Sequence, residues 1–251
     1  MSNTMLELWD LHKTYCVKSS DVKYEALKGV DFQAEEGDFI AIMGESGSGK
    51  TTTLNIIASL DTPTSGEVVI GGVDISKMNN KEICKFRREN LGFVFQDFNL
   101  LNYFTVKDNI AFPLVLLNKS KKEIDEKVSE LAEQTGITKL LNKYPYEISG
   151  GEKQRTAVAR ALVCDPQLVL ADEPTGALDS KNSDQLMELF QTFNDKGQTI
   201  IMVTHSVKSA ARAKKVLFLK DGTIGNTLDK ADRDDDEFKE EIANFLYNSG
   251  K

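Results

Sequence analysis

The chain of 251 residues contains few histidines and cysteines, and each shortage excludes a kind of site. Its two histidines, His12 and His205, exclude a histidine-rich metal centre. Its three cysteines, Cys16, Cys84 and Cys164, stand far apart and are odd in number, which argues against metal-ligand spacing and against a disulfide framework. Reduced thiols in a cytoplasmic protein are the simplest interpretation.

Long apolar runs are also missing. The longest run, residues 111–117, is too short to span a bilayer and contains Pro113. No basic region followed by an apolar stretch stands at the start of the sequence, so we expect no signal peptide. A role at a membrane would therefore require a partner that holds the protein there.

Acidic charge is concentrated near the end of the chain. The formal net charge is −8, and residues 229–241 hold eight acidic and three basic residues, a net of −5. A nearly balanced body with an acidic tail is not typical of a nucleic-acid-binding protein, so we expect no nucleic-acid partner. The tail itself is expected to be a solvated helix or a disordered extension without chemistry of its own.

Short apolar segments alternate with helical patterns along the chain. Strands are predicted at 39–43, 67–72, 91–96, 167–172, 199–204 and 215–220. Helical patterns occupy 50–59 and about 105–134, and the amphipathic part of the second pattern ends at Gly136. This alternation predicts an α/β fold with a largely parallel central sheet, and the mostly helical block at about 97–160 predicts a separate lobe.

A glycine-rich loop, GESGSGKT at residues 44–51, directly follows the first of these apolar strands. It matches the phosphate-loop pattern in the required strand–loop–helix context. The glycines Gly44, Gly47 and Gly49 let backbone N–H groups face phosphate oxygens. Lys50 supplies a positive charge for the β- and γ-phosphates, and Thr51 supplies a hydroxyl for Mg²⁺.

A second set of polar residues stands where other predicted strands end. Asp172 and Glu173 follow a buried strand, where the first can hold Mg²⁺ and the second can polarise an attacking water. Gln96 ends another strand and can reach the metal or the water. His205 ends a third strand, where its side chain can meet the γ-phosphate. A lone histidine after a strand is usually structural, but its matching position at the strand ends favours a functional role.

A further anion site is indicated by ISGGEKQR at residues 148–155. Two glycines follow Ser149, and a helix-forming run follows them, so free N–H groups and the positive end of a helix dipole point in the same direction. One phosphate loop already serves one nucleotide, so the second site is unexplained by the residues alone.

These motifs, in this order and joined by GALD at 176–179, resemble the ATPase subunit of an ABC transporter over about residues 5–222. The resemblance implies a P-loop ABC-type domain with a mostly parallel core sheet, an antiparallel β subdomain and a helical subdomain, followed by an acidic extension at 223–251. It implies ATP and Mg²⁺ as cofactors, with Thr51, Gln96 and Asp172 at the metal and with Lys50, Gln96, Glu173 and His205 in hydrolysis. The phosphate-loop contacts would come from Gly44, Glu45, Ser46, Gly47, Ser48, Gly49, Lys50, Thr51 and Thr52.

The resemblance also gives the second anion site a role. In such proteins two chains pack head to tail, and the serine-glycine-glycine stretch binds the γ-phosphate of ATP held by the other copy. Ser149, Gly150, Gly151 and Glu152 would thus complete the site of a second copy, and Asp179 would communicate across the interface.

The remaining roles concern the base and the membrane partner. The family usually stacks an aromatic ring near the N-terminus on adenine, and Tyr15 is the best match, with Tyr24 as the competitor. The lobe at 97–160, with Phe98–Val106 nearest, would contact an integral membrane permease. Departures from the family pattern are small: Ile148 and Glu152 in the signature, and Glu45, which can point outward from the phosphate loop.

Two longer stretches, QDFNLLNYFTVKDNIAFPL and DEPTGALDSKN, resemble a bacterial branch of this family. The branch includes macrolide exporters, lipoprotein-release complexes and antimicrobial-peptide resistance transporters, and GALDSK with the acidic extension is most similar to the bacitracin- and lantibiotic-resistance type. That type implies a permease of ten membrane helices, a sensor histidine kinase reached through it, and a place on the inner face of the cell membrane. Lipoprotein release, macrolide export and a cell-division-type mechanical ATPase stay open, and a soluble nucleic-acid ATPase is disfavoured.

Overall fold

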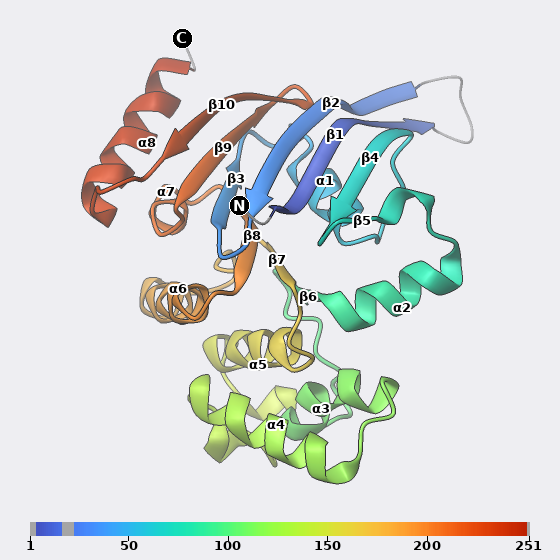
Figure 1. Ribbon diagram of the computed structural model, residues 1–251. Coiled ribbons are helices and arrows are strands. Elements are labelled where there is room, and N and C mark those ends of the chain that lie inside the picture. Colours follow the sequence, from blue (N-terminus) through green and yellow to red (C-terminus); the bar gives the residue numbers. More distant parts are fainter. Residues whose placement is uncertain (1–3, 17–22, 250–251) are drawn as a thin grey trace.

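Two β-sheets and a helical lobe make up the computed structural model, which describes residues 4–16 and 23–249 (Figure 1). The six-stranded sheet has the order β10-β9-β3-β8-β7-β6, and the four-stranded sheet has the order β2-β1-β4-β5. The strands of the first are β3 (Phe39–Met43), β6 (Leu91–Val94), β7 (Leu168–Asp172), β8 (Thr199–Val203), β9 (Lys215–Lys220) and β10 (Thr223–Asp229). Those of the second are β1 (Thr4–Cys16), β2 (Lys23–Glu35), β4 (Ser65–Ile70) and β5 (Val73–Asp74).

Five strands of the larger sheet are parallel, and β10 is antiparallel to β9. The sequence of β3 is apolar throughout because both faces of this strand are covered. Ile40 and Ile42 pack into the core shared with the four-stranded sheet and with α1 (Lys50–Ile57). Phe39, Ala41 and Met43 pack into a second core, which includes side chains of α6 (Ser180–Asp195). The predicted α/β fold with a mostly parallel sheet is confirmed.

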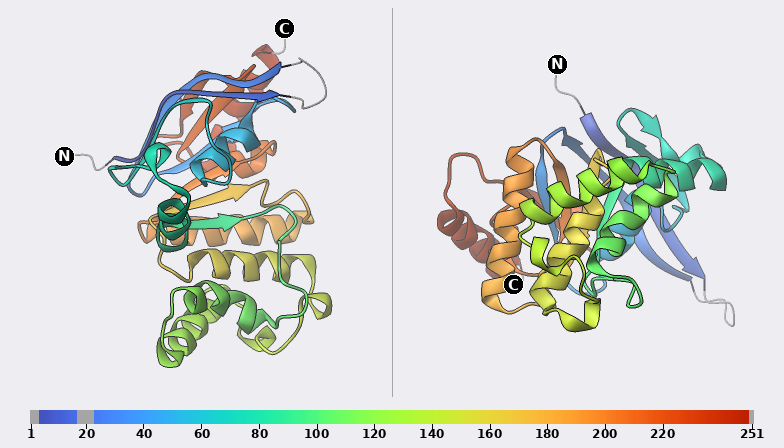
Figure 2. Two further views of the ribbon diagram at one scale, coloured as in Figure 1. Left: turned by 90° about the vertical axis from the view of Figure 1, so that its right-hand side faces the viewer. Right: turned by 90° about the horizontal axis from the view of Figure 1, so that it is seen from below.

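The helical lobe lies at the end of the molecule away from the four-stranded sheet (Figure 2). It contains α3 (Val106–Leu116), α4 (Lys121–Gln134) and α5 (Gly150–Leu162), whereas α2 (Asn80–Asn90) leads into β6. The continuous helical pattern expected at 105–134 is divided in the structure. Asn118 has a left-handed backbone with φ 55°, and Ser120 then caps α4 by accepting a hydrogen bond from the Glu123 N–H.

The C-terminal segment belongs to the folded body. β10 extends the sheet beyond residue 222, and α8 (Asp235–Ser249) lies along the edge of the sheet (Figure 1). Phe238 and Ile242 on α8 are fully buried, and the Phe245 ring meets the Phe218 ring at 4.3 Å between centroids. The expectation of a solvated or disordered tail was therefore wrong for this face of α8, although its acidic residues do face outward. No helix in the described part of the chain has the length and apolar character needed to cross a membrane.

Candidate active site

The phosphate loop connects the carboxyl end of β3 to the start of α1. Its tight path requires glycine: a Cβ at Gly44 would lie 2.1 Å from the Leu219 carbonyl oxygen, and Gly49 has φ 107°. Gly49 caps α1 without any side-chain hydrogen bond, so the first N–H groups of the helix have no capping side chain. Glu45 is exposed, as expected for a side chain that points away from the loop.

Lys50 reaches back over this loop. Its Nζ donates hydrogen bonds to the carbonyl oxygens of Gly44 at 2.9 Å and of Glu45 at 2.7 Å. Burial lowers the pKa of the Lys50 ammonium, and the charges of Glu173 and Asp172 oppose that shift. The ammonium is therefore partly desolvated and close to the loop that would hold the phosphates, which strengthens its attraction for an anion.

Thr51 and Asp172 come together from two elements that are far apart in sequence. The Thr51 Oγ1 donates to Asp172 Oδ1 at 3.4 Å. Burial raises the pKa of the Asp172 carboxyl, the Glu173 charge adds to this, and the Thr51 hydroxyl and Lys50 oppose it. A hydroxyl and a partly buried carboxylate are the hard oxygen donors that Mg²⁺ prefers, so these residues fit that ion.

Glu173 and His205 form the pair expected at the reacting end of the nucleotide. His205 Nδ1 lies 2.9 Å from Glu173 Oε2, and the same oxygen accepts a hydrogen bond from the His205 backbone N–H at 3.2 Å. Glu173 has a left-handed backbone with φ 44°, and its own N–H donates to the Val203 carbonyl. Strain of this kind at a non-glycine residue is typical of a functional position.

Gln96 lies beside the loop that follows Glu173. Its side-chain nitrogen would be 3.3 Å from a Cβ placed on Gly176, so the close approach of these two segments depends on that glycine. Gln96 is exposed, and the structure brings it near the Glu173 loop.

The second anion motif forms the N-terminus of α5. Ser149 caps the helix in a capping box: its Oγ accepts from the Glu152 N–H, and Glu152 Oε2 accepts from the Ser149 N–H and Oγ, each at 2.8 Å. A Cβ on Gly151 would lie 2.0 Å from Asn182 Oδ1, which shows how tightly α5 meets the start of α6. Asp179 caps α6 by accepting from Asn182.

No hydrogen bond or ion pair within 4–16 and 23–249 joins Ser149 or Glu152 to the phosphate loop. The structure thus brings the loop, Thr51, Asp172, Glu173 and His205 to one edge of the sheet, and the α5 terminus, predicted to bind a second anion, lies apart from them.

The two candidate tyrosines take different positions. The Tyr15 hydroxyl donates to Asp61 Oδ2 at 2.7 Å, and burial with the Asp61 hydrogen bond raises its pKa. The Thr52 side chain opposes that rise in the pKa of Tyr15, which places the Tyr15 hydroxyl near the start of α1. The Tyr24 hydroxyl instead donates to the Gly47 carbonyl at 3.0 Å. Both rings are partly exposed and both touch the loop or its helix, so the geometry alone does not choose between them.

Two residues of α5 belong to this region and were not singled out in the sequence. Gln154 is fully buried, and its Nε2 donates to the carbonyls of Phe95 at 3.2 Å and Pro174 at 2.8 Å. Arg160 donates to the carbonyls of Asn99 and Phe98. They connect α5 to the segments around Gln96 and Glu173. The signal was available, because Gln154 is a polar residue in line with Val158 and Ala161 on the apolar stripe of the helix.

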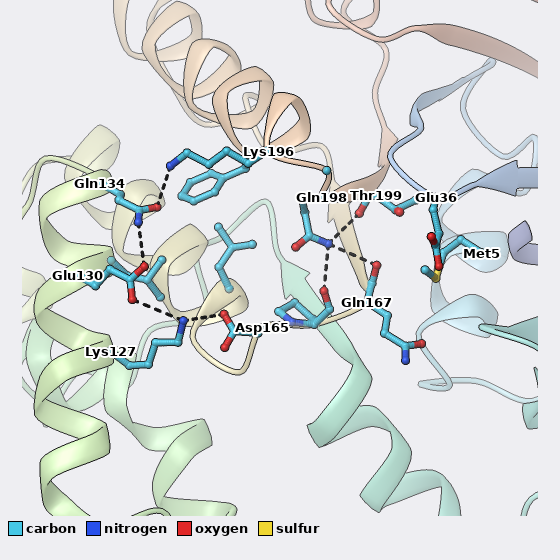
Figure 3. A pocket seen from close by; sticks show the side chains of 15 residues that line it. Met5, Glu36, Lys127, Glu130, Gln134, Asp165, Gln167, Lys196, Gln198 and Thr199 are labelled. Atoms are coloured by element: carbon cyan, nitrogen blue, oxygen red, sulfur yellow. Dashed lines mark hydrogen bonds and ion pairs between the residues drawn. The ribbon is translucent and has the colours of Figure 1, made fainter. Parts of the chain in front are cut away.

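Two cavities lie at opposite ends of the larger sheet, one beside the phosphate loop and one away from the predicted site residues. A cavity of about 400 Å³ has Gly44–Ser48 on one side and Phe218, Lys220, Phe245 and Leu246 on the other. Another, of about 420 Å³, lies at the opposite end of the sheet, where β7 and β8 begin (Figure 3). There Lys127 pairs with Asp165 at 2.7 Å, and none of the predicted site residues lines it.

The site consists of a strand–loop–helix of the phosphate-binding type, with a Thr–Asp pair and a Glu–His pair at the carboxyl ends of neighbouring parallel strands. These features define the class of P-loop nucleoside triphosphatases. Residues 27–176 match the family model described as ABC transporter. The chain belongs to the ABC transporter family and is one of its ATP-hydrolysing, ATP-binding subunits.

Individual relatives agree with that assignment. The chain is 44% identical over 239 residues to the bacitracin export ATP-binding protein BceA of Halalkalibacterium halodurans, covering 95% of this chain and 94% of that protein. It is 46% identical over 198 residues to the macrolide export ATP-binding/permease protein MacB of Campylobacter jejuni, covering 79% of this chain but only 31% of that protein. The resemblance to this branch is therefore confirmed.

A solved structure agrees in fold. The dimeric, post-hydrolysis state of the ATP-binding cassette MJ0796, bound to ADP and Pi, superimposes with a TM-score of 0.83 at 38% identity. The match covers 90% of this chain and 98% of that one.

Proposed function

We propose that this chain is the ATPase subunit of an antimicrobial-peptide resistance transporter of the bacitracin or lantibiotic type, working with a separate membrane permease. The observation that carries the proposal is the match to BceA along nearly the whole of both chains, including the acidic C-terminal segment. The match to MacB stops at the ATP-binding part of a longer ATP-binding/permease protein. Macrolide export is therefore the second candidate.

The proposed chemistry follows from the residues at the sheet edge. Lys50 and the uncapped N–H groups of α1 bind and orient the β- and γ-phosphates. Thr51 and Asp172, together with Gln96, would hold Mg²⁺, which when bound neutralises charge on the transferring phosphoryl group. Glu173 accepts a proton from the attacking water, and His205, held by Glu173, faces the γ-phosphate.

A complete site in this proposal needs a second copy of the chain. The α5 terminus, with Ser149, Gly150 and Gly151, would bind the γ-phosphate held by the partner, and Asp179 would lie at the same interface. Two observations support this: the α5 terminus is a capped anion site without a phosphate loop of its own, and the related cassette MJ0796 has a dimeric structure.

The permease would dock on a groove between the helical lobe and the core. This groove of about 400 Å³ is lined by apolar side chains that include Leu60, Phe93, Phe112 and Leu116. Tyr103 in the neighbouring 98–106 segment is 95% exposed, which is unusual for a large aromatic side chain without a partner. A short cytoplasmic segment of a permease fits a groove of this size, and it would place the chain on the inner face of the membrane. A sensor histidine kinase working with that permease completes the proposal on family resemblance alone.

The proposal is tested by measuring which drugs the native host becomes sensitive to when the protein is inactivated. Lys50→Ala at the chromosomal locus should raise sensitivity to bacitracin or a lantibiotic and leave macrolide sensitivity unchanged. Glu240→Gln, a neutral change on the exposed face of α8, is the control. Unchanged peptide sensitivity with increased macrolide sensitivity would favour the export function, and filamentous growth with normal drug tolerance would favour the cell-division type.

A further inference from the structure

The C-terminal helix α8 is joined to the chain segment that carries His205. β8 ends at Val203, His205 follows, and Ser206 caps the short helix α7 (Val207–Ala210) by accepting a hydrogen bond from the Ser209 N–H. Two residues after α7, the Arg212 Nε lies 3.0 Å from Asp235 Oδ2 in the first turn of α8. Only six residues therefore separate His205 from Arg212 of the ion pair.

The ion pair sits over a packed interface. Ala210, Ala211 and Ala213 share one apolar core with Phe238 and Ile242 of α8, all nearly or fully buried. The small alanines let the two segments approach closely. Because Arg212 is 25% exposed and Asp235 35% exposed at the side chain, the pair is screened less than an ordinary surface pair.

The α7 segment also contacts the loop that follows Glu173. The hydroxyls of Thr175 and Ser209 lie 3.1 Å apart in a buried hydrogen bond. A displacement of α7 would act on His205 through the continuous chain but on the Glu173 loop through this hydrogen bond, so it would change the position of His205 relative to Glu173. By contrast, the far end of α8 faces the phosphate loop across the 400 Å³ cavity lined by Phe245 and Leu246, so its link to that loop is loose.

We propose that Arg212 and Asp235 are positioning residues for ATP hydrolysis, through which α8 holds α7 and thereby sets the position of His205 against Glu173. Asp235 is in turn held by Lys230, and Arg212 lies 3.5 Å from Gln191 on α6. In this proposal α8 stabilises the position of the catalytic residues at the edge of the sheet. This inference rests on the family's ATPase activity and is independent of the transported substrate.

The test compares catalysis with nucleotide binding in the purified full-length chain. Arg212→Ala should lower kcat by about fivefold, the rate equivalent of a partly exposed ion pair, and change the ATP affinity by less than about twofold. Hydrogen exchange should become faster in residues 204–213 and stay unchanged in β3. Arg212→Lys, which keeps a positive charge, should recover most of the activity, and Asp235→Asn should reproduce the loss.

The matched control is Glu240→Gln, because Glu240 is an exposed acid on the same helix. Wild-type kcat in Arg212→Ala and Asp235→Asn would overturn the proposal. So would a loss of ATP affinity equal to the loss in kcat, since that would indicate general destabilisation. If Arg212→Ala does not fold, Arg212→Lys and Asp235→Asn decide the question. Unchanged peptide sensitivity of the host that carries Lys50→Ala would contradict the proposed function and would leave the inference about this pair standing.

Discussion

Two helix N-termini in this chain look alike in sequence but differ in what surrounds them. Glycine precedes α1 and opens α5, and both helices can attract an anion through their N–H groups and helix dipole. At α1 the cap is Gly49, no side chain occupies the N–H groups, and Lys50, Asp172 and Glu173 are near. At α5 the cap is Ser149, whose hydroxyl and N–H are occupied by Glu152.

The difference shows that an anion site becomes catalytic only through the groups placed beside it. The α1 site has Thr51, Asp172 and Glu173 beside it on one sheet edge, whereas the only carboxylate hydrogen-bonded at the described α5 terminus, that of Glu152, is engaged by Ser149, so in our proposal the α5 terminus acts with the α1 site of another chain. Ser149 would then exchange its bond to Glu152 for one to phosphate. The capping bond lowers the pKa of Glu152, so its carboxylate stays charged and keeps Ser149 oriented until that exchange.

The largest expected effect comes from removing the proton acceptor at the complete site. Glu173→Gln should lower the hydrolysis rate by about 10²–10⁴-fold, because an amide cannot take the proton from water. ATP binding should persist, since Lys50 and the loop are unchanged. Phosphate release measures the rate, and light scattering with Mg²⁺ and ATP should show a dimer; a monomer with ATP bound would contradict the composite site.

The dependence of the α5 site on another chain can be tested by mixing two inactive variants. Lys50→Ala spoils only the phosphate loop, and Ser149→Arg spoils only the α5 terminus, so a mixed dimer keeps one complete site. An equal mixture should recover about a quarter of wild-type activity, because about half of the dimers are mixed and each has one site of two. Each variant alone is the control. Wild-type hydrolysis by Ser149→Arg alone would show that α5 has no part in the site.

A smaller effect is expected where the base of the nucleotide binds. Tyr15→Ala should weaken ATP binding by about 1–3 kcal/mol, the usual contribution of base stacking, and Tyr15→Phe should bind ATP almost normally because the ring is kept. Tyr24→Ala should have the lesser effect, since we expect Tyr15 to stack on the base. Titration with a fluorescent nucleotide compares them. A larger loss from Tyr24→Ala would assign the adenine to Tyr24.

The smallest effect concerns the charge at Asp172. Burial raises its folded pKa above the unfolded value of about 3.9, so this group stabilises the nucleotide-free protein most below that value and less as pH rises through the folded pKa. The amide introduced by Asp172→Asn cannot ionise, so this variant does not lose folding stability as the pH rises. It should melt up to a few degrees higher than wild type at pH 7 without Mg²⁺. Melting curves between pH 4 and 8 test this. A lower melting temperature for the variant at pH 7 would contradict the sign of this effect on stability.

Much of the fold and the site could be predicted from the sequence because the signals are local. The run FIAIM predicts a strand covered on both faces, and the loop after it must contain glycine because its backbone turns against Leu219. The polar residues at strand ends, such as Asp172 and His205, could be placed together because parallel strands bring their carboxyl ends to one edge.

Other features were missed, one of them despite a signal in the sequence and one because its partners are distant in the chain. The acidic tail appeared solvated from its composition, yet Phe238, Ile242, Phe245 and Leu246 have the i, i+4, i+7, i+8 spacing of a buried helix face. The place of Gln154 on the apolar stripe of α5 was visible in the sequence, but its acceptors, the carbonyls of Phe95 and Pro174, were not, because they are distant in the chain.

The sequence by itself determined the chemistry of this protein. Its glycines and Lys50 form a phosphate loop after an apolar strand, and its strand-end acids supply the carboxylates. Only the tertiary structure decided which groups act together. It joined Thr51 to Asp172 and Glu173 to His205, and it attached α8 to the histidine segment through Arg212 and Asp235. The physical reason is that charge and backbone shape are local properties, whereas burial and contact depend on the whole chain.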